Sequence, residues 1–125
     1  MITSRSILIA AALAGAAAVV LGAFGAHALR GSLDERALAT WHTAVDYQLW
    51  HTLALIGIVA LSRDAVSRAL RVAAIAFLAG IVLFCGSLYL VALGAPRGFG
   101  AITPIGGLAF IVGWLALVAH AWRSS

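Results

Sequence analysis

Four long apolar runs constrain this chain more than any other feature of its sequence. Each run has about twenty residues, and about twenty helical residues at 1.5 Å per residue cross the ~30 Å hydrocarbon layer of a bilayer. The runs are rich in Ala, Leu and Gly and lack the alternation that is typical of membrane β-strands. The sequence therefore predicts four transmembrane helices, at residues 7–28, 43–61, 70–93 and 104–122.

The composition leaves almost nothing for a water-facing surface. Of the 125 residues, 64% are hydrophobic and 10% are charged, whereas roughly a quarter of the residues in a soluble domain are charged. The predicted fold class is an all-α membrane protein, in which residues 1–125 form one compact four-span bundle. The first run exceeds the roughly 7–15 apolar residues of a signal-peptide core, so we expect it to be retained as the first span.

The first span carries a row of small residues. Ala14, Ala18 and Gly22 recur every four residues, which places them on one face of a helix. Small residues at this spacing let helix backbones approach closely in lipid, where packing replaces the hydrophobic drive. The row predicts tight helix packing and not a ligand site.

The segment 29–40 connects the first two spans. Ser32, followed three residues later by Glu35, has the form of a capping box. It predicts a short interfacial helix that starts at Leu33 and bends into the second span. Trp41 stands at the border of that span, and we expect its indole ring to lie at the membrane–water interface.

Arginine supplies the basic side chains, and its distribution predicts the orientation in the membrane. The net charge is +4, and the eight arginines stand singly between apolar runs, so they form no patch for nucleic acid. Four crossings place both termini and the central loop on one side, with five arginines against three. Because basic residues favour the cytoplasmic side, we expect cytoplasmic termini. The five are Arg5, Arg63, Arg68, Arg71 and Arg123.

Polar side chains within the spans gather in one leaflet once this topology is applied. Polar groups inside a bilayer are candidates for function, because burying them without partners costs free energy. We expect His27, His51 and Tyr89 to lie at a common level near the extracytoplasmic face. The candidate site residues are His27, Tyr47, Gln48, His51, Ser87 and Tyr89.

Helical geometry limits the chemistry of the second span. His42 and Asp46 lie one turn apart and are secondary candidates, favoured as a solvated ion pair over a metal site. Tyr47 and His51 also lie one turn apart and can interact along the helix. His42 and His51 point in opposite directions and cannot ligate one metal ion, and a neutral His51 bonded across helices is favoured over a proton relay. Cys85 is the one cysteine, which excludes an intrachain disulfide and a cysteine metal cluster. No metal, cofactor or catalytic residue is predicted.

Four ordered blocks of residues carry a resemblance to a known family. They are GAFGAHAL at Gly22–Leu29; Trp41, Ala44-Val45, Tyr47-Gln48, His51 and Ala54-Leu55; Phe84 with GSLYL at Gly86–Leu90; and ITPIGG at Ile102–Gly107. Together they resemble the domain-of-unknown-function 423 family, whose animal relatives are called transmembrane protein 256. The resemblance implies a small four-span protein of the bacterial inner membrane and no established reaction, substrate or cofactor. The family pattern does not require His42, Asp46 or Cys85, and it falls on His27, Tyr47, Gln48, His51, Ser87, Tyr89, Thr103 and Pro104.

Three hypotheses for function stay open at this point. The first is a non-enzymatic structural or accessory component of a membrane assembly, or a homo-oligomer, because small-residue faces abound and no soluble domain is present. The alternative is a small proton-coupled transporter or channel that uses the outer-leaflet polar cluster. The second alternative is a haem or metal site held by His27 and His51. Hydrolytic catalysis is not expected, because no serine or cysteine has a motif-supported base beside it.

Overall fold

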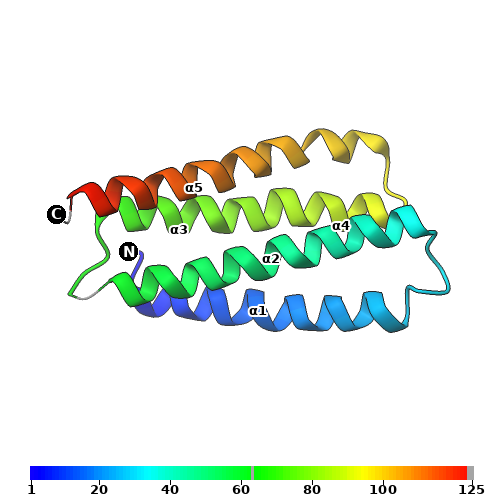
Figure 1. Cartoon of the computed structure of the whole chain (residues 1–125), viewed down its shortest axis with the longest axis horizontal. Helices are drawn as coiled ribbons and strands as arrows, with labels where there is room; N and C mark the ends of the chain where they lie inside the picture. Colours follow the sequence, from blue (N-terminus) through cyan, green and yellow to red (C-terminus); the bar gives the residue numbers. More distant parts are fainter. Residues whose placement is uncertain (63, 124–125) are drawn as a thin grey trace.

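The chain folds into four long antiparallel rods, with no strand among the residues that the structure describes (Figure 1). The computed structural model describes residues 1–62 and 64–123. Each rod is long and apolar enough to cross a membrane, so the predicted all-α, four-span fold class is confirmed. The elements are α1 Ser4–His27, α2 Glu35–Leu61, α3 Arg68–Gly80, the π-helical η1 Ile81–Cys85, α4 Gly86–Ala92, the 3₁₀-helical η2 Arg97–Ala101 and α5 Thr103–Arg123.

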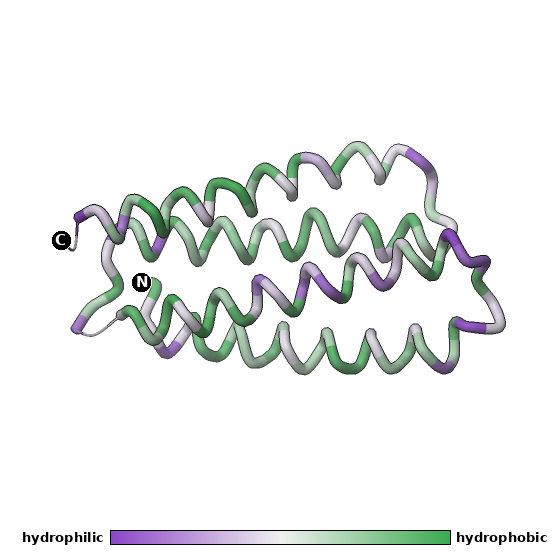
Figure 2. Tube along the Cα trace, in the orientation of Figure 1, coloured by the Kyte–Doolittle hydropathy of each residue, from purple (hydrophilic) through white to green (hydrophobic). Residues whose placement is uncertain are grey.

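The third rod is continuous and consists of α3, η1 and α4, which lie beside α2 at the centre of the molecule (Figure 1). The helix α1 packs along α2 on one side, and α5 packs along α3 on the other. Both termini lie at the end that also holds the connection between α2 and α3. Arg63, one of the arginines in the orientation argument, lies outside the described residues. Figure 2 shows hydrophilic residues at the two ends of the bundle and along the middle of α2.

The start of α2 differs from the sequence prediction. Asp34 is the N-cap residue, and its carboxylate accepts a hydrogen bond from the backbone N–H of Ala37 at 2.8 Å. The predicted start after Ser32 and the separate interfacial helix are wrong, because α2 continues without a break from Glu35 to Leu61. An aspartate at this position satisfies a free N–H group as well as serine does, and its charge interacts favourably with the helix dipole.

Trp41 joins α2 to α1 inside the bundle. Its side chain is 2% exposed, and its Nε1–H donates to the backbone carbonyl oxygen of Leu21 at 2.9 Å. A Cβ atom on Gly25 would lie 2.5 Å from the indole ring, so this close approach requires glycine. The indole therefore packs against the neighbouring helix α1, and its depth at the membrane–water interface stays a prediction.

The row of small residues on the first span packs against α2, as expected. Ala18 is fully buried, and a Cβ atom on Gly22 would lie 3.3 Å from the side chain of Val45. On the other side of the molecule, Gly113 of α5 lies against the ring of Phe77. The small residues that supported the prediction of a homo-oligomer therefore pack against helices of the same chain.

Candidate functional site

Gln48 connects three helices in the interior of the bundle. Its Nε2–H donates to the backbone carbonyl oxygen of Ala14 on α1 at 2.9 Å, and its Oε1 accepts from the Tyr89 hydroxyl on α4 at 2.8 Å. The ring of Tyr89 also packs edge-on against Trp41, with ring centres 4.7 Å apart. Gln48 is buried, so its amide forms hydrogen bonds within the chain and not with water.

Ser87 connects α4 to the start of α5. Its hydroxyl donates to the backbone carbonyl oxygen of Phe84 at 3.0 Å, and its Oγ lies 2.6 Å from Oγ1 of Thr103. Because a serine hydroxyl has one proton, the Thr103 hydroxyl is the donor in the second bond. Both hydroxyls therefore have partners, and Ser87 bonds to α5 whereas Tyr89, two residues later, bonds to Gln48 on α2.

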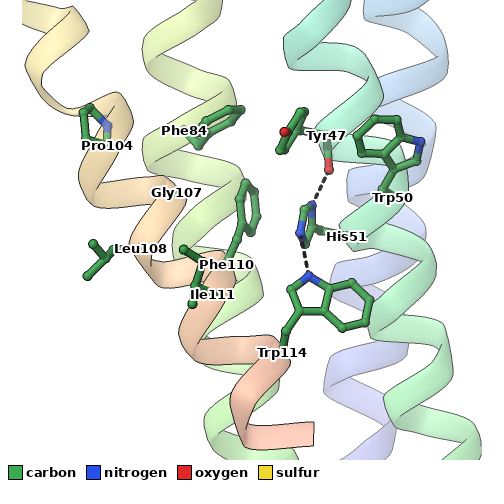
Figure 3. Close-up of a pocket in the computed structure, with 10 residues that line it drawn as sticks. All are labelled: Tyr47, Trp50, His51, Phe84, Pro104, Gly107, Leu108, Phe110, Ile111 and Trp114. Atoms are coloured by element: carbon green, nitrogen blue, oxygen red, sulfur yellow. Dashed lines mark hydrogen bonds between the residues drawn. The ribbon is translucent and has the colours of Figure 1, made fainter. Parts of the chain in front are cut away.

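His51 lies between α2 and α5 with both ring nitrogens engaged (Figure 3). Nδ1 is 2.7 Å from the backbone carbonyl oxygen of Tyr47, and Nε2 is 3.2 Å from Nε1 of Trp114. A carbonyl can only accept and an indole N–H can only donate, so the proton is on Nδ1 and the ring is neutral. The ring stacks on Phe110, with centres 3.6 Å apart and planes inclined by 12°. This is the cross-helix hydrogen bonding that the sequence favoured over a relay.

A groove of about 540 Å³ opens between α2 and α5 beside His51 (Figure 3). Aromatic side chains form most of its wall, and none of its lining residues carries a formal charge. The exposed faces of Leu108 and Ile111 stand at its edge on α5. We call this feature the aromatic groove, and its aromatic residues are Tyr47, Trp50, His51, Phe84, Phe110 and Trp114.

The half of the aromatic groove on α5 was missed by sequence reasoning. Phe110 and Trp114 follow Gly106 at four-residue spacing, so the three share one face of a helix. That spacing is the signal that was available. Phe84 was part of a family block in the sequence but was not identified as a site residue, and the structure places it in the π-helical turn η1, a type of turn that is frequent at functional sites.

A family model covers most of these positions. Residues 21–107 match the family described as "Protein of unknown function (DUF423)". This chain belongs to that family. The match includes the α2 and η1 sides of the aromatic groove and ends at Gly107, before Phe110 and Trp114.

The relatives of this DUF423 protein are named as membrane proteins. It is 46% identical over 106 residues to the UPF0382 membrane protein YwdK of Bacillus subtilis, across 83% of this chain and 85% of that protein. It is 43% identical over 116 residues to the UPF0382 membrane protein SH2409 of Staphylococcus haemolyticus, across 93% and 94%. It is 38% identical over 121 residues to the UPF0382 inner membrane protein YgdD of Escherichia coli K12, across 97% and 92%. No solved structure matches the chain. The resemblance seen in the sequence is confirmed, and the chain is a membrane protein.

His27 lies far from the other candidates in this DUF423 protein. It is the last residue of α1 and is exposed. Because Gln48 bonds to Ala14, His51 lies about 24 Å from His27 along the bundle axis, at ~1.5 Å per helical residue. The predicted common level of His27, His51 and Tyr89 is therefore wrong. The sequence prediction took the depth of each polar side chain from the bounds of the apolar runs. The helix α2 begins at Glu35, well before the second apolar run.

The remaining candidates show what chemistry the site supports. His42 and Asp46 are exposed on α2 and do not line the aromatic groove. His27 and His51 are too far apart to ligate one haem iron, and no group of three or more His, Cys, Asp or Glu side chains among the described residues can hold a metal ion. Cys85 is buried in the core. The geometry fits the binding of a neutral, apolar molecule better than proton or metal chemistry.

Proposed function

We propose that this protein is a non-enzymatic structural or accessory component of an assembly in the bacterial inner membrane. Its interior polar side chains Gln48, His51 and Ser87 bond to atoms of neighbouring helices, which supports a role in holding one arrangement of the bundle. The name of one relative places that relative in the inner membrane. The function then depends on the outer surfaces of the bundle.

The exposure of the two outer helices, α1 and α5, carries this proposal. An apolar 18-residue stretch is 17% buried within the chain in α1 and in the span Arg97–Arg123 that contains α5, against 39% in α2 and 33% in the third rod. Large apolar side chains project from both, such as Leu13 on α1 and Leu115 on α5. Van der Waals packing against another membrane helix stabilises such faces in lipid, so both can hold a neighbouring protein.

Photo-crosslinking in intact membranes tests the proposal. A photoreactive phenylalanine analogue at Leu13, or separately at Leu115, is expected to form a discrete product with a protein from at least one of the two sites. The matched control is ordinary phenylalanine at the same position, which should give no product on irradiation. A product of twice the mass of the chain identifies a second copy as the neighbour, and any other mass identifies a different protein.

Two observations together would contradict the proposed assembly. Lipid adducts alone at both positions, together with the mass of one chain by native mass spectrometry in mild detergent, would contradict an assembly. The protein would then be a monomer in the bilayer.

We also infer that both termini lie in the cytoplasm. Among the described residues, four arginines lie at the end of the bundle with the termini and three at the other, and basic residues favour the cytoplasmic side. The four are Arg5, Arg68, Arg71 and Arg123. In a Cys85→Ala background, Ser32→Cys is expected to react with an impermeant maleimide in intact spheroplasts. Asp64→Cys is expected to react only after lysis, and the reverse pattern of labelling would overturn this orientation.

A proton-coupled transporter is the alternative role, and it needs a titratable group on a path across the membrane. Asp46 is exposed on α2, and both nitrogens of His51 are bonded within the chain. These positions favour the accessory role over transport.

A further inference from the structure

The hydroxyl of Tyr47 stands out because this residue lines the aromatic groove. Oγ1 of Thr52 is buried without a hydrogen-bond partner among the described residues but does not line the aromatic groove, whereas Tyr47 does line it. Gln48, Ser87 and Tyr89 each have a hydrogen-bond partner, whereas the Tyr47 hydroxyl has none among the residues that the structure describes. In Figure 3 this hydroxyl projects from α2 toward the space beside Phe84. An unpaired hydroxyl at membrane depth is unfavourable, because lipid tails offer it no partner. An acceptor atom on a bound molecule would satisfy it.

The wall of the aromatic groove restricts what that molecule can be. The ring of Tyr47 lies with its centre 4.6 Å from that of Phe84 and 5.0 Å from that of Trp50. Aromatic faces and edges of this kind bind flat rings through offset-stacked and edge-to-face contacts. No lining residue carries a formal charge, so a phosphate, carboxylate or ammonium group has no counter-ion there. The occupant is therefore neutral and contains a flat ring.

The size and opening of the aromatic groove indicate where the molecule comes from. Its volume of about 540 Å³ lies within the roughly 300–1,000 Å³ of small-molecule sites. Trp50, Leu108 and Trp114 line it and are exposed on the apolar surface of the spans, so the opening faces the acyl chains. A ligand enters from the bilayer and must be soluble in lipid.

The wall is also held in place without a ligand. His51 is fixed by its bonds to Tyr47 and Trp114 and by stacking on Phe110. A Cβ atom on Gly107 would lie 3.8 Å from Phe84, so the absence of a side chain there keeps the space open. A preformed wall favours binding, because little side-chain order has to be gained.

We propose that the aromatic groove binds a neutral, lipid-soluble molecule whose flat ring carries a carbonyl oxygen, the chemistry of a quinone. The Tyr47 hydroxyl donates a hydrogen bond to that carbonyl, and the ring lies among Phe84, Phe110 and Trp114. A plain acyl chain fits less well, because it offers no acceptor to Tyr47 and no ring to the wall. This proposal does not depend on the accessory role, since the aromatic groove is complete within one chain.

Fluorescence quenching tests the proposal on the full-length protein in phosphatidylcholine nanodiscs. The probe is a benzoquinone with a decyl chain, which quenches tryptophan, and Trp50 and Trp114 flank the aromatic groove. Collisional quenching in lipid rises without limit, whereas binding saturates at one probe per chain. Saturable quenching is expected in the wild type. Tyr47→Phe is expected to raise the dissociation constant about five- to tenfold, the loss of one hydrogen bond.

The chain provides a matched control. Tyr89→Phe removes the same hydroxyl from a tyrosine that bonds to Gln48 and does not line the aromatic groove, so its dissociation constant should equal that of the wild type. Gly107→Leu fills the space and is expected to abolish the saturable component, with folding of each variant checked by circular dichroism. Decylbenzene, which has a ring but no carbonyl, should compete weakly for the site.

Three results would overturn the proposal. They are quenching without saturation in the wild type, equal dissociation constants for Tyr47→Phe and Tyr89→Phe, and displacement of the probe by decylbenzene or hexadecane as strong as that by a second quinone. The last result would assign the aromatic groove to acyl chains.

Discussion

Replacing Gly106 with alanine is expected to destabilise the folded bundle by about 3 kcal/mol, at the upper end of the usual effect of overpacking. The Cβ atom of the new residue would lie 2.3 Å from the backbone nitrogen of Phe84 and 2.7 Å from its Cα. These atoms belong to the backbone of the third rod, so they cannot rotate aside as a side chain can. The helix α5 must move outward, and the core packing of Phe110 against His51 is then lost.

The neighbouring glycine provides the control for this prediction. A Cβ atom on Gly107 would lie 3.8 Å or more from the ring of Phe84, which is ordinary contact, so Gly107→Ala is expected to change stability by less than about 0.5 kcal/mol. The free energy of unfolding is measured by titration from a mild detergent into a denaturing one. Equal stability of the two variants would show that α5 does not approach η1 as closely as the structure has it.

The four rods could be predicted because an apolar run long enough to cross a bilayer has few stable structures other than a helix. Helices satisfy their own backbone hydrogen bonds, which lipid demands of any spanning segment. The ends of the helices were less predictable, because several residues can cap a helix. Ser32 and Asp34 both fit an N-cap, and the structure uses Asp34.

The depth of the polar side chains could not be predicted, because it depends on how far each helix slides past its neighbour. That register is set by contacts between side chains distant in sequence, such as Trp41 against Gly25 and Gln48 against Ala14. These contacts place Gln48, in the middle of α2, beside Ala14 in the middle of α1, and leave His27 at the far end of α1. Polar residues that share a span end in the sequence therefore do not share a level in the molecule.

The aromatic groove was hidden from sequence reasoning for a related reason. It lies between α2 and α5, which form the second and the fourth span, with the third rod behind them. The π-helical turn η1 that presents Phe84 has an ordinary apolar sequence, Ile81–Cys85. At this turn, Gly106 lets α5 approach the backbone of Phe84. That contact depends on how the two helices pack, so neither segment of sequence predicts it alone.

Gln48→Leu is expected to destabilise the protein by about 2 kcal/mol, the second-largest effect predicted here. Leucine keeps most of the volume of the side chain but removes both hydrogen bonds of the amide. The Ala14 carbonyl oxygen lies within a helix, but the Tyr89 hydroxyl depends on Oε1 of Gln48 as its acceptor. It is then left without an acceptor within the bundle, which costs free energy.

A double-mutant cycle separates this hydrogen bond from the general cost of changing a buried residue. Tyr89→Phe alone is expected to cost about 1 kcal/mol, because it leaves Oε1 without its donor. The double variant removes donor and acceptor together, so its loss should be about 2 kcal/mol and not the sum of about 3 kcal/mol, which gives a coupling energy of about 1 kcal/mol. Unfolding in mixed detergents measures all four proteins under one set of conditions. Strict additivity would mean that Tyr89 and Gln48 are not bonded, and the connection between α2 and α4 would then consist of apolar packing such as that of Tyr89 on Trp41.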